Sequence, residues 1–333
     1  MVDAVALVLW LGVTLYAVFG GADFGAGSWD LVAGGAERGR RPRALIDVAI
    51  GPVWEANHVW LIFCLVVLWT GFPTAFASIM TTLYIPLTIA AFGIVARGAG
   101  FAFVRVSTRL SLKRVYGATF AISSLIAPFF LGAVAGAIAS GRVPTNGQGD
   151  PWDSWVNPTS ALGGVLAVLT CAYLAAVFLV SDARRHGAPE LEAYFRVRAI
   201  GAAVVVGIVA FAGIWILQDD APRLHDRLLD QALPLVVISV LLGLAALVLL
   251  IRDVPRLARA CGAGAVAAVI GGWGVAQYPY LLGTHLTLDQ GAAPDSALAW
   301  ILGVFVLALV TVVPGLFLLY ALDQRGDLEA VET

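Results

Sequence analysis

Nine long apolar stretches divide this chain, and they constrain its fold more than any other feature. A helix needs about 20 apolar residues to cross the hydrocarbon core of a bilayer, because each residue adds only about 1.5 Å of rise. The polar connections between the stretches are short, so we expect no appended soluble domain. The predicted spans are residues 4–29, 48–70, 75–104, 116–140, 160–181, 199–217, 232–251, 258–278 and 297–320.

The composition agrees with a membrane protein. Hydrophobic residues make up 60% of the 333 residues, and charged residues make up only 13%. A soluble domain has about 25% charged residues, so this chain could not cover a surface that faces water. The sequence therefore predicts an all-α integral membrane protein with one membrane domain over residues 1–333. We expect two four-helix units at 1–141 and 158–278, a last peripheral helix at 297–320, and a cytoplasmic tail at 321–333.

Positive charge is distributed unevenly among the loops. Of the 20 Lys and Arg residues, 17 are assigned to one side of the membrane, and only Arg142, Arg223 and Arg227 to the other. The positive-inside rule makes the richer side cytoplasmic, which places the N-terminus outside and the C-terminus inside. No Lys or Arg precedes Arg38, so the first stretch lacks the basic leader of a signal peptide and is predicted to be a retained span.

The end of the first span, FGGADFGAGSWD, combines small residues with an acid. Gly21 and Gly25 are four residues apart and would let another helix approach closely. Asp23 lies between them, inside the predicted membrane, where ionisable groups are costly and usually functional. Asp23 is therefore a candidate for proton or ion transfer. The alternative is a packing stripe in which the acid only bonds a neighbouring helix.

The second span opens with IGPVWEANHVW, in which an acid, an amide and an imidazole lie among apolar residues. On a continuous helix, Asp47 and His58 share one face about 16 Å apart, and Glu55 lies within about 60° of His58. Pro52 lacks an amide donor and would free a backbone carbonyl for water or a side chain. Carboxyl groups in apolar surroundings have raised pKa values, which suits proton transfer. We expect these titratable groups to pass protons inward from the cytoplasm; the alternative is a set of hydrogen bonds that fixes helix packing.

Metal ligands are scarce in the sequence. His58 is the one histidine in a predicted span, whereas a haem with two axial histidines needs a second one at depth. His58 could ligate a five-coordinate haem, but a packing role is the simpler interpretation. Cys64, Cys171 and Cys261 are separate residues in apolar runs and lack CxxC spacing. We therefore predict no metal site in this chain.

Several segments, in order along the chain, carry a family resemblance. The most specific is IGPVWEANHVWL at residues 50–61, which is similar to GPxWDGNEVWL. The others are ADFGAG at 22–27, FPTAF at 72–76, ARGAGFAF at 96–103, and YPYLL at 278–282 followed by LTLDQGAAPDSAL at 286–298. Together they span nearly the whole chain, which resembles subunit II of the cytochrome bd-type quinol oxidases.

The resemblance implies a function. Such oxidases take electrons from quinol and reduce dioxygen to water, with protons drawn from the cytoplasm. In the family, haems b and d belong to subunit I, while subunit II forms the heterodimer, supports haem assembly and contributes part of a proton path. It thus implies a bacterial cell (inner) membrane, subunit I as partner, and no haem on this chain. A structural quinone, membrane lipid and a small single-span subunit are further expected components, and nothing indicates nucleic acid.

Residue roles follow from the matched motifs. Glu55 stands where the family has the acid of WDGN, so the resemblance implies a proton-conducting carboxylate there. Asp23 matches the second acid of a DGFD-like segment. Trp54, Asn57 and Trp60 match neighbours that support the proton path.

The sequence departs from the family at three positions of that path. Gly20 and Ala102 stand where relatives have acids, and His58 stands where they have an acid or an amide. The unperturbed pKa of histidine, about 6.5, suits a relay, so we expect His58 to compensate.

Two other functions share the same sequence features. A proton- or ion-coupled transporter would also need buried acids, but such folds show interrupted helices at matching positions in two halves, and none is visible. A purely scaffolding subunit would use the buried polar groups only for packing.

Overall fold

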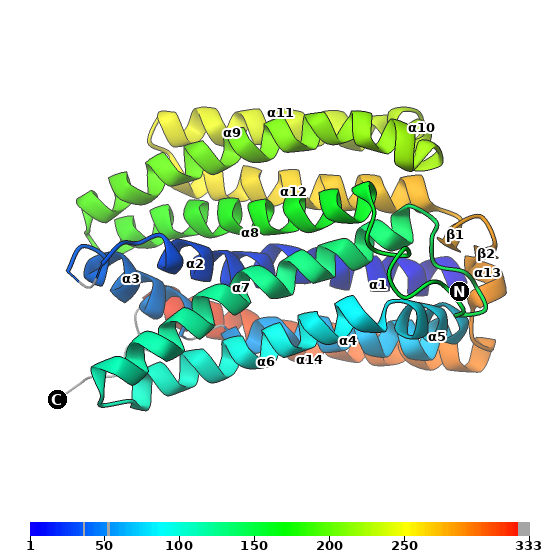
Figure 1. The fold of residues 1–333 in the computed structure, drawn as a ribbon, viewed down its shortest axis with the longest axis horizontal. Helices are drawn as coiled ribbons and strands as arrows, with labels where there is room; N and C mark the ends of the chain where they lie inside the picture. The colour runs from blue at the N-terminus through cyan, green and yellow to red at the C-terminus, as the bar shows by residue number, and fades with distance from the viewer. Residues whose placement is uncertain (36, 52–53, 326–333) are drawn as a thin grey trace.

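The computed structural model describes residues 1–35, 37–51 and 54–325, and these are almost wholly helical (Figure 1). Within those ranges nine helices are long and apolar enough to cross a membrane, which confirms the predicted fold class. The first span consists of α1 (Val2–Leu15) and α2 (Gly21–Leu31), joined by a π-helix, η1 (Tyr16–Gly20). The other eight are α4 (Trp54–Gly71), α6 (Tyr84–Val106), α7 (Leu110–Ala139), α8 (Pro158–Arg185), α9 (Pro189–Asp220), α11 (Leu233–Ile251), α12 (Pro255–Gln277) and α14 (Asp295–Arg325).

Short elements connect the spans. They are α3 (Arg40–Ile50), α5 (Pro73–Thr82), α10 (Pro222–Leu229), α13 (Leu288–Gly291) and an antiparallel pair of strands, β1 (Tyr280–Leu282) and β2 (Leu286–Thr287). Many helices begin with proline in the first turn, where the missing amide costs no hydrogen bond. At α8 the Asn157 side chain also caps the helix by accepting a hydrogen bond from the Ser160 amide at 2.9 Å.

Two predicted spans were wrong at their starts. The stretch 48–70 is not one helix, because α3 ends at Ile50 and α4 begins at Trp54. Asp47 and His58 therefore lie on separate helices instead of on one face. A Gly-Pro pair at this point of the sequence disfavours a continuous helix, although Pro52 itself lies outside the described residues.

The stretch 75–104 also divides into two helices. Helix α5 ends before Leu83 and α6 begins after it. Pro86 in the first turn of α6 lacks the amide that would bond the Thr82 carbonyl, so the α5 ladder cannot continue across this point. The spanning part of this stretch is thus α6, and α5 is an additional short helix.

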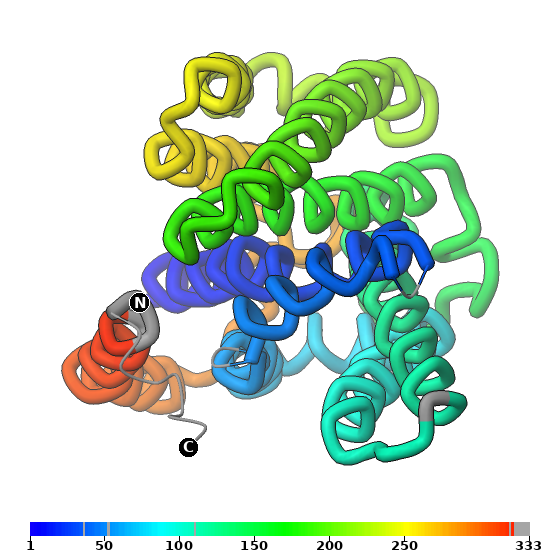
Figure 2. The backbone as a smooth tube through the Cα atoms, turned by 90° about the vertical axis from the view of Figure 1, so that its left-hand side faces the viewer, coloured from blue at the N-terminus to red at the C-terminus, as the bar shows by residue number. Residues whose placement is uncertain are grey.

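The helices are arranged in layers. The first span and α8 run through the middle, with α9 and α11 on one side and α4, α6 and α14 on the other (Figures 1 and 2). In the most apolar 18-residue part of α7 and of α8, half of the residues are buried. In the corresponding part of α14, none of the described residues is buried. Helix α8 packs against α7 and α2 as well as α9, so close contacts cross the boundary between the two predicted four-helix units. The division into these units therefore stays a prediction.

Glycines bring α7 and α8 into backbone contact. A Cβ atom on Gly132 would lie 2.4 Å from the Gly163 carbonyl oxygen, and one on Gly136 would lie 2.6 Å from the Thr159 carbonyl oxygen. No side chain fits in so little space. Small residues thus set the approach of these two central helices, as is typical of membrane proteins.

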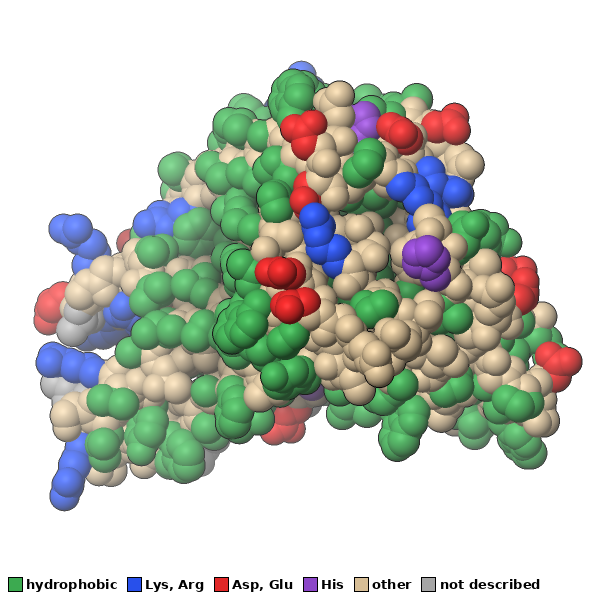
Figure 3. All heavy atoms as spheres, turned by 45° about the vertical axis from the view of Figure 1, so that its right-hand side comes forward, with side chains coloured by type: hydrophobic (Ala, Val, Ile, Leu, Met, Phe, Trp, Pro, Cys, Tyr) green, Lys and Arg blue, Asp and Glu red, His purple; other side chains and the backbone are tan. Residues whose placement is uncertain are grey.

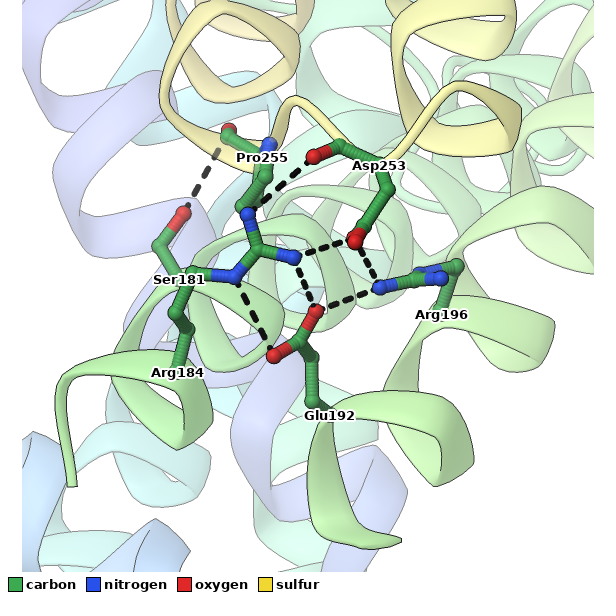
Figure 4. A network of polar contacts seen from close by, with 6 residues as sticks. All are labelled: Ser181, Arg184, Glu192, Arg196, Asp253 and Pro255. Carbon is green, nitrogen blue, oxygen red and sulfur yellow. Dashed lines mark hydrogen bonds and ion pairs between the residues drawn. The ribbon is translucent and has the colours of Figure 1, made fainter. Parts of the chain in front are cut away.

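An ion-pair network ties together the ends of three helices on the predicted cytoplasmic side (Figure 4). Arg184 of α8 bonds both oxygens of Glu192 on α9 and also bonds Asp253, in the turn between α11 and α12. Arg196 contacts the same two carboxylates. Nearby, the Ser181 hydroxyl donates to the Pro255 carbonyl at 3.4 Å. Arg184 and Arg196 hold the pKa of Asp253 below its usual value, against the opposing effect of burial.

The two ends of the molecule differ in charge. Basic side chains gather at one end, and hydrophobic side chains cover much of the flank next to them (Figure 3). Helix α1 begins and α14 ends at opposite ends of the bundle (Figure 1), as an odd number of spans requires. The direction of the bundle in the membrane stays a prediction.

Candidate functional site

Asp23 forms a buried ion pair with Arg97. Asp23, on α2, is 4% exposed, and Arg97, on α6, is 0% exposed. Arg97 Nη2 donates to Asp23 Oδ1 at 2.7 Å and to the Asp23 carbonyl at 3.1 Å. Arg97 Nε donates to the Ser124 hydroxyl of α7 at 3.1 Å. One guanidinium thus connects three spans at the centre of the protein.

Sequence reasoning missed this partner of Asp23. Arg97 is one of the 17 basic residues counted on the cytoplasmic side, where the sequence predicts it near a helix end; it instead lies fully buried within α6. The guanidinium lies 5.0 Å from the ring centroids of both Phe24 and Phe120, so aromatic faces and one carboxylate together replace water. A signal was present, because apolar and small residues flank Arg97 on both sides within a single span.

Several polar atoms beside this ion pair lack partners. Among the described residues, Asp23 Oδ2, Arg97 Nη1 and the Tyr16 hydroxyl are buried without a hydrogen bond. Tyr16 begins the π-helix that leads into α2, and its ring meets Phe24 edge-on at 6.4 Å. Single π-helical turns are frequent at functional sites because they shift side chains out of the regular register. Buried polar atoms of this kind usually bond ordered water or a ligand.

A cavity of about 70 Å³ adjoins Asp23, and five polar residues interrupt its largely apolar lining. Asp23 and the buried Asn57 of α4 line it, so the structure brings together two of the residues singled out in the sequence. Asp182 and Arg185 of α8 and Arg259 of α12 line the same cavity. Its remaining lining residues are Phe19, Ala22, Ala26, Ala49, Ile50, Ala175, Phe178 and Leu179. We call this space the polar cavity.

His58 packs on Phe24, whose ring also lies against Arg97, and it does not line the polar cavity. Its Nδ1 donates to the Trp54 carbonyl at 2.8 Å, since a carbonyl oxygen can only accept. The imidazole meets the Phe24 ring edge-on at 6.1 Å and the Trp54 ring at 6.3 Å. The Trp54 indole in turn packs on Phe101 at 5.5 Å. Aromatic packing therefore fixes the orientation of the imidazole.

Glu55 is separated from the polar cavity. Its side chain is exposed, in the first turn of α4, while Asn57 on the same helix points inward. Trp60, farther along α4, is half-buried and contacts Phe63 at 6.4 Å. The exposed face of α4 continues from Glu55 through apolar side chains at helical spacing, namely Val59, Ile62, Val66 and Trp69.

Asp47 lies on α3, outside the nine described spans. Asp47 is exposed at the surface, but the neighbouring protein removes part of the water around its carboxylate. This partial burial, together with the nearby Asp30 carboxylate, raises the Asp47 pKa to about 6, against the opposing charges of Arg105 and Arg43. Asp47 can therefore change its charge near neutral pH.

Gly21 and Gly25 lie against α8. A Cβ on Gly25 would lie 1.8 Å from the Cys171 carbonyl oxygen, and one on Gly21 would lie 3.4 Å from Leu174 Cδ1. Asp23 is therefore placed where two helix backbones approach most closely. On the next turn, the Trp29 indole donates to the Ala172 carbonyl at 2.7 Å and fastens the same two helices.

The site residues do not fit a haem or a metal ion. Within the described part of the chain, no group of three or more His, Cys, Asp or Glu side chains could hold a metal ion. His58 is the one histidine in the described spans, and it does not line the polar cavity. No histidine, cysteine or methionine is among the described residues that line the polar cavity.

Comparison with known proteins identifies the family. Residues 1–322 match the family described as cytochrome bd terminal oxidase subunit II. The chain is 27% identical over 299 residues to cytochrome bd ubiquinol oxidase subunit 2 of Bacillus subtilis, covering 88% of this chain and 86% of that protein. It is 25% identical over 229 residues to cytochrome bd-I ubiquinol oxidase subunit 2 of Escherichia coli, covering 65% of this chain and 58% of that protein.

A solved structure agrees. The structure of bd oxidase from Geobacillus thermodenitrificans contains a chain that superimposes with a TM-score of 0.77 at 26% identity, covering 96% of this chain and 98% of that chain. Sequence and fold therefore agree over nearly the whole length, and the chain belongs to the cytochrome bd terminal oxidase subunit II family.

Proposed function

We propose that this subunit conducts protons from the predicted cytoplasmic side toward the oxygen-reducing centre of the complex. The chain is a subunit of a cytochrome bd quinol oxidase, a multi-pass membrane protein whose complex includes a subunit I and haem. Reduction of dioxygen to water consumes protons as well as electrons. A subunit with buried titratable groups next to a polar cavity can supply them.

The observation that carries the proposal is the Asp23 carboxylate at the polar cavity. One oxygen of Asp23 holds Arg97, and the other is buried without a partner among the described residues. That second oxygen can accept a proton from water in the cavity while the first keeps its ion pair. A purely structural carboxylate beside a buried arginine would be expected to use both oxygens, because bidentate geometry is stronger.

The onward part of the route runs along α4. Asn57 lines the polar cavity, His58 follows it in the sequence, and Glu55 lies on the exposed face of the same helix turn. A bare carboxylate facing lipid is costly, so we infer that subunit I covers Glu55 in the complex. Glu55 would then pass protons across the interface. Trp54 and Trp60 would hold this segment in place, and Asp47 on α3 would supply a further titratable group at the cytoplasmic surface.

Other parts of the complex are proposed from the family. We place haems b and d in subunit I, and we assign this subunit a role in assembling them. A bacterial cell membrane, a small single-span subunit, bound lipid and a structural quinone belong to the same proposal. The comparisons support neither a transporter nor a purely scaffolding subunit.

The test uses the complex purified through a tag on this chain. We expect it to contain a second large subunit with haem bands in the reduced-minus-oxidised spectrum, and to take up oxygen with quinol. Asp23→Asn and Glu55→Gln should each slow oxygen uptake by about tenfold or more, because proton transfer by a positioned side chain accelerates a reaction by about 10²- to 10⁴-fold. The haem spectrum should not change.

Glu37→Gln is the matched control, because Glu37 is an exposed acid outside the described spans. It should leave turnover unchanged. Wild-type turnover in both Asp23→Asn and Glu55→Gln would refute the proton path and leave the buried pair a packing role.

A further inference from the structure

We propose that Asp182 of α8 is the carboxylate that takes protons from the cytoplasm and delivers them through water in the polar cavity to Asp23. This inference rests on the proposed function and adds the point at which protons leave bulk water. It begins with the shape of the polar cavity. Asp23 and Asn57 line it together with Asp182, Arg185 and Arg259, so a single space connects the buried ion pair with charged residues near the ends of α8 and α12.

The cavity is large enough for water. A buried water needs about 10–15 Å³ and two to four polar partners. At about 70 Å³ the polar cavity has room for several. Asp23 lines this cavity, and its Oδ2 has no hydrogen-bond partner among the described residues, so Oδ2 is the Asp23 oxygen that is free to take a proton.

The position of Asp182 along α8 gives its distance from Asp23. Its residues at the cavity follow helical spacing on one face, from Ala175 through Phe178 and Leu179 to Asp182. Gly25 packs on the Cys171 carbonyl, so Asp23 lies at about the depth of Cys171. Asp182 is eleven residues beyond Cys171, which is about 16 Å of helix rise. The two carboxylates cannot touch, and water must bridge them.

Asp182 is the second carboxylate among the residues that line the cavity. Its side chain is 13% exposed, enough to exchange protons with water at the surface. Arg185 Nη2 lies 3.7 Å from Asp182 Oδ1, and the Arg259 guanidinium stacks on Phe178 at 3.9 Å. Arg185 holds the Asp182 carboxylate at the rim, and Arg259 adds a second positive charge to the lining of the cavity.

The transfer moves protons and no electrons. The Asp182 carboxylate takes a proton from a cytoplasmic water and passes it to water in the cavity. That water gives a proton to Asp23 Oδ2, and the next proton from bulk water restores Asp182. Each hop breaks one O–H bond and forms another, so charge and atoms balance.

The experiment uses the intact oxidase complex with Asp182→Asn, Asp182→Glu and Asp226→Asn. Asp226 is an exposed acid on α10, with 77% side-chain exposure, outside the described spans, and serves as the matched control. We expect Asp182→Asn to lower kcat for quinol-driven oxygen uptake by about tenfold, with KM for quinol unchanged. Asp182→Glu should stay near the wild-type rate. Added acetate, a small proton carrier, should partly restore Asp182→Asn and leave the wild type unchanged.

The experiment distinguishes failure of the Asp182 inference from failure of the proposed function. Wild-type turnover in Asp182→Asn, with Asp23→Asn still slow, would overturn this inference and leave the proposed proton path in place. A slow Asp182→Asn that acetate does not restore, with Asp182→Glu equally slow and less heat-stable, would assign Asp182 a structural role and also overturn it. Wild-type turnover in both Asp23→Asn and Glu55→Gln would instead refute the proposed function itself.

Discussion

At the scale of single residues, Asp23 and Arg97 form an ion pair whose side chains are almost completely buried. A buried carboxylate or guanidinium without a partner is strongly destabilising, by about 3–5 kcal/mol once its partner is removed. Asp23 and Arg97 therefore depend on each other, although they lie 74 positions apart in the sequence. The sequence pointed to Asp23 as a titratable group in a span. It could not show the partner, because the pairing exists only where α2 and α6 meet.

Asp47 gives a pH-dependent prediction at this scale. Its pKa is raised to about 6 in the folded protein, from an ordinary value of 3.8. Between these pH values the folded state keeps a proton that the unfolded chain has lost, so stability falls as pH rises from about 4 to about 6. Asp47→Asn removes this loss. We expect the variant to melt a few degrees above the wild type at pH 7.5 and to show no gain at pH 4, measured as the apparent Tm of the detergent-solubilised complex.

Asp150 supplies a control with the opposite sign. The amides of Asp153 and Trp152 bond its carboxylate and lower its pKa, so its contribution to stability is present at neutral pH and is lost as pH falls. Asp150→Asn should therefore not raise the Tm at pH 7.5. An Asp47→Asn variant that is equally stabilised at pH 4 would show that its effect is unrelated to ionisation.

At the scale of elements, helix spans follow directly from apolar length, but their breaks do not. The π-helix at Tyr16–Gly20 and the division at Leu83 arise within long apolar runs, where hydropathy gives no signal. At α6 the sequence does carry a signal, because Pro86 lacks the amide that would continue the hydrogen bonds of the preceding helix. Prolines in first helical turns marked many of the remaining starts.

Gly25 gives the prediction at the scale of elements. Gly25→Ala would place a Cβ 1.8 Å from the Cys171 carbonyl oxygen, so α2 and α8 must separate. Overpacking of this kind costs about 1–3 kcal/mol. We expect a lower apparent Tm and a lower yield of the assembled complex.

Gly117→Ala on α7 is the control, because a Cβ at Gly117 meets nothing within 4 Å. It should leave both Tm and yield unchanged. Equal behaviour of the two variants would show that the contact between α2 and α8 is not tight in the membrane.

At the scale of the whole molecule, nine spans and an uneven distribution of positive charge predict how the subunit lies in the membrane. Basic residues make up most of the charge on the loops at one end, and the positive-inside rule assigns that end to the cytoplasm. The proposed proton route needs this direction, because Asp182 and the polar cavity must receive protons from the cytoplasm.

Orientation is tested with single added cysteines. Asn146→Cys lies in the exposed loop between α7 and α8, and Thr108→Cys lies in the exposed loop between α6 and α7. We expect a membrane-impermeant thiol reagent to label Asn146→Cys in intact cells and Thr108→Cys only after permeabilisation. The wild-type chain, with its three native cysteines, gives the background. The reverse labelling pattern would invert the topology and contradict proton uptake at Asp182 from the cytoplasm.

Hydrophobic length and the cost of charge in lipid act locally along the chain, so the class of this protein, its nine predicted spans and its candidate acids can be read from the order of the residues. The motif around Glu55 and His58 also indicated the family, through resemblance and not through physics. Three relations appear only in the folded chain: Arg97 pairs with Asp23, Glu55 faces outward while Asn57 faces the polar cavity, and Asp182 shares that cavity. These relations depend on how helices distant in sequence rotate and approach. The spacing of Gly21 and Gly25 predicts a close approach of another helix, but not that the Cys171 backbone of α8 makes it.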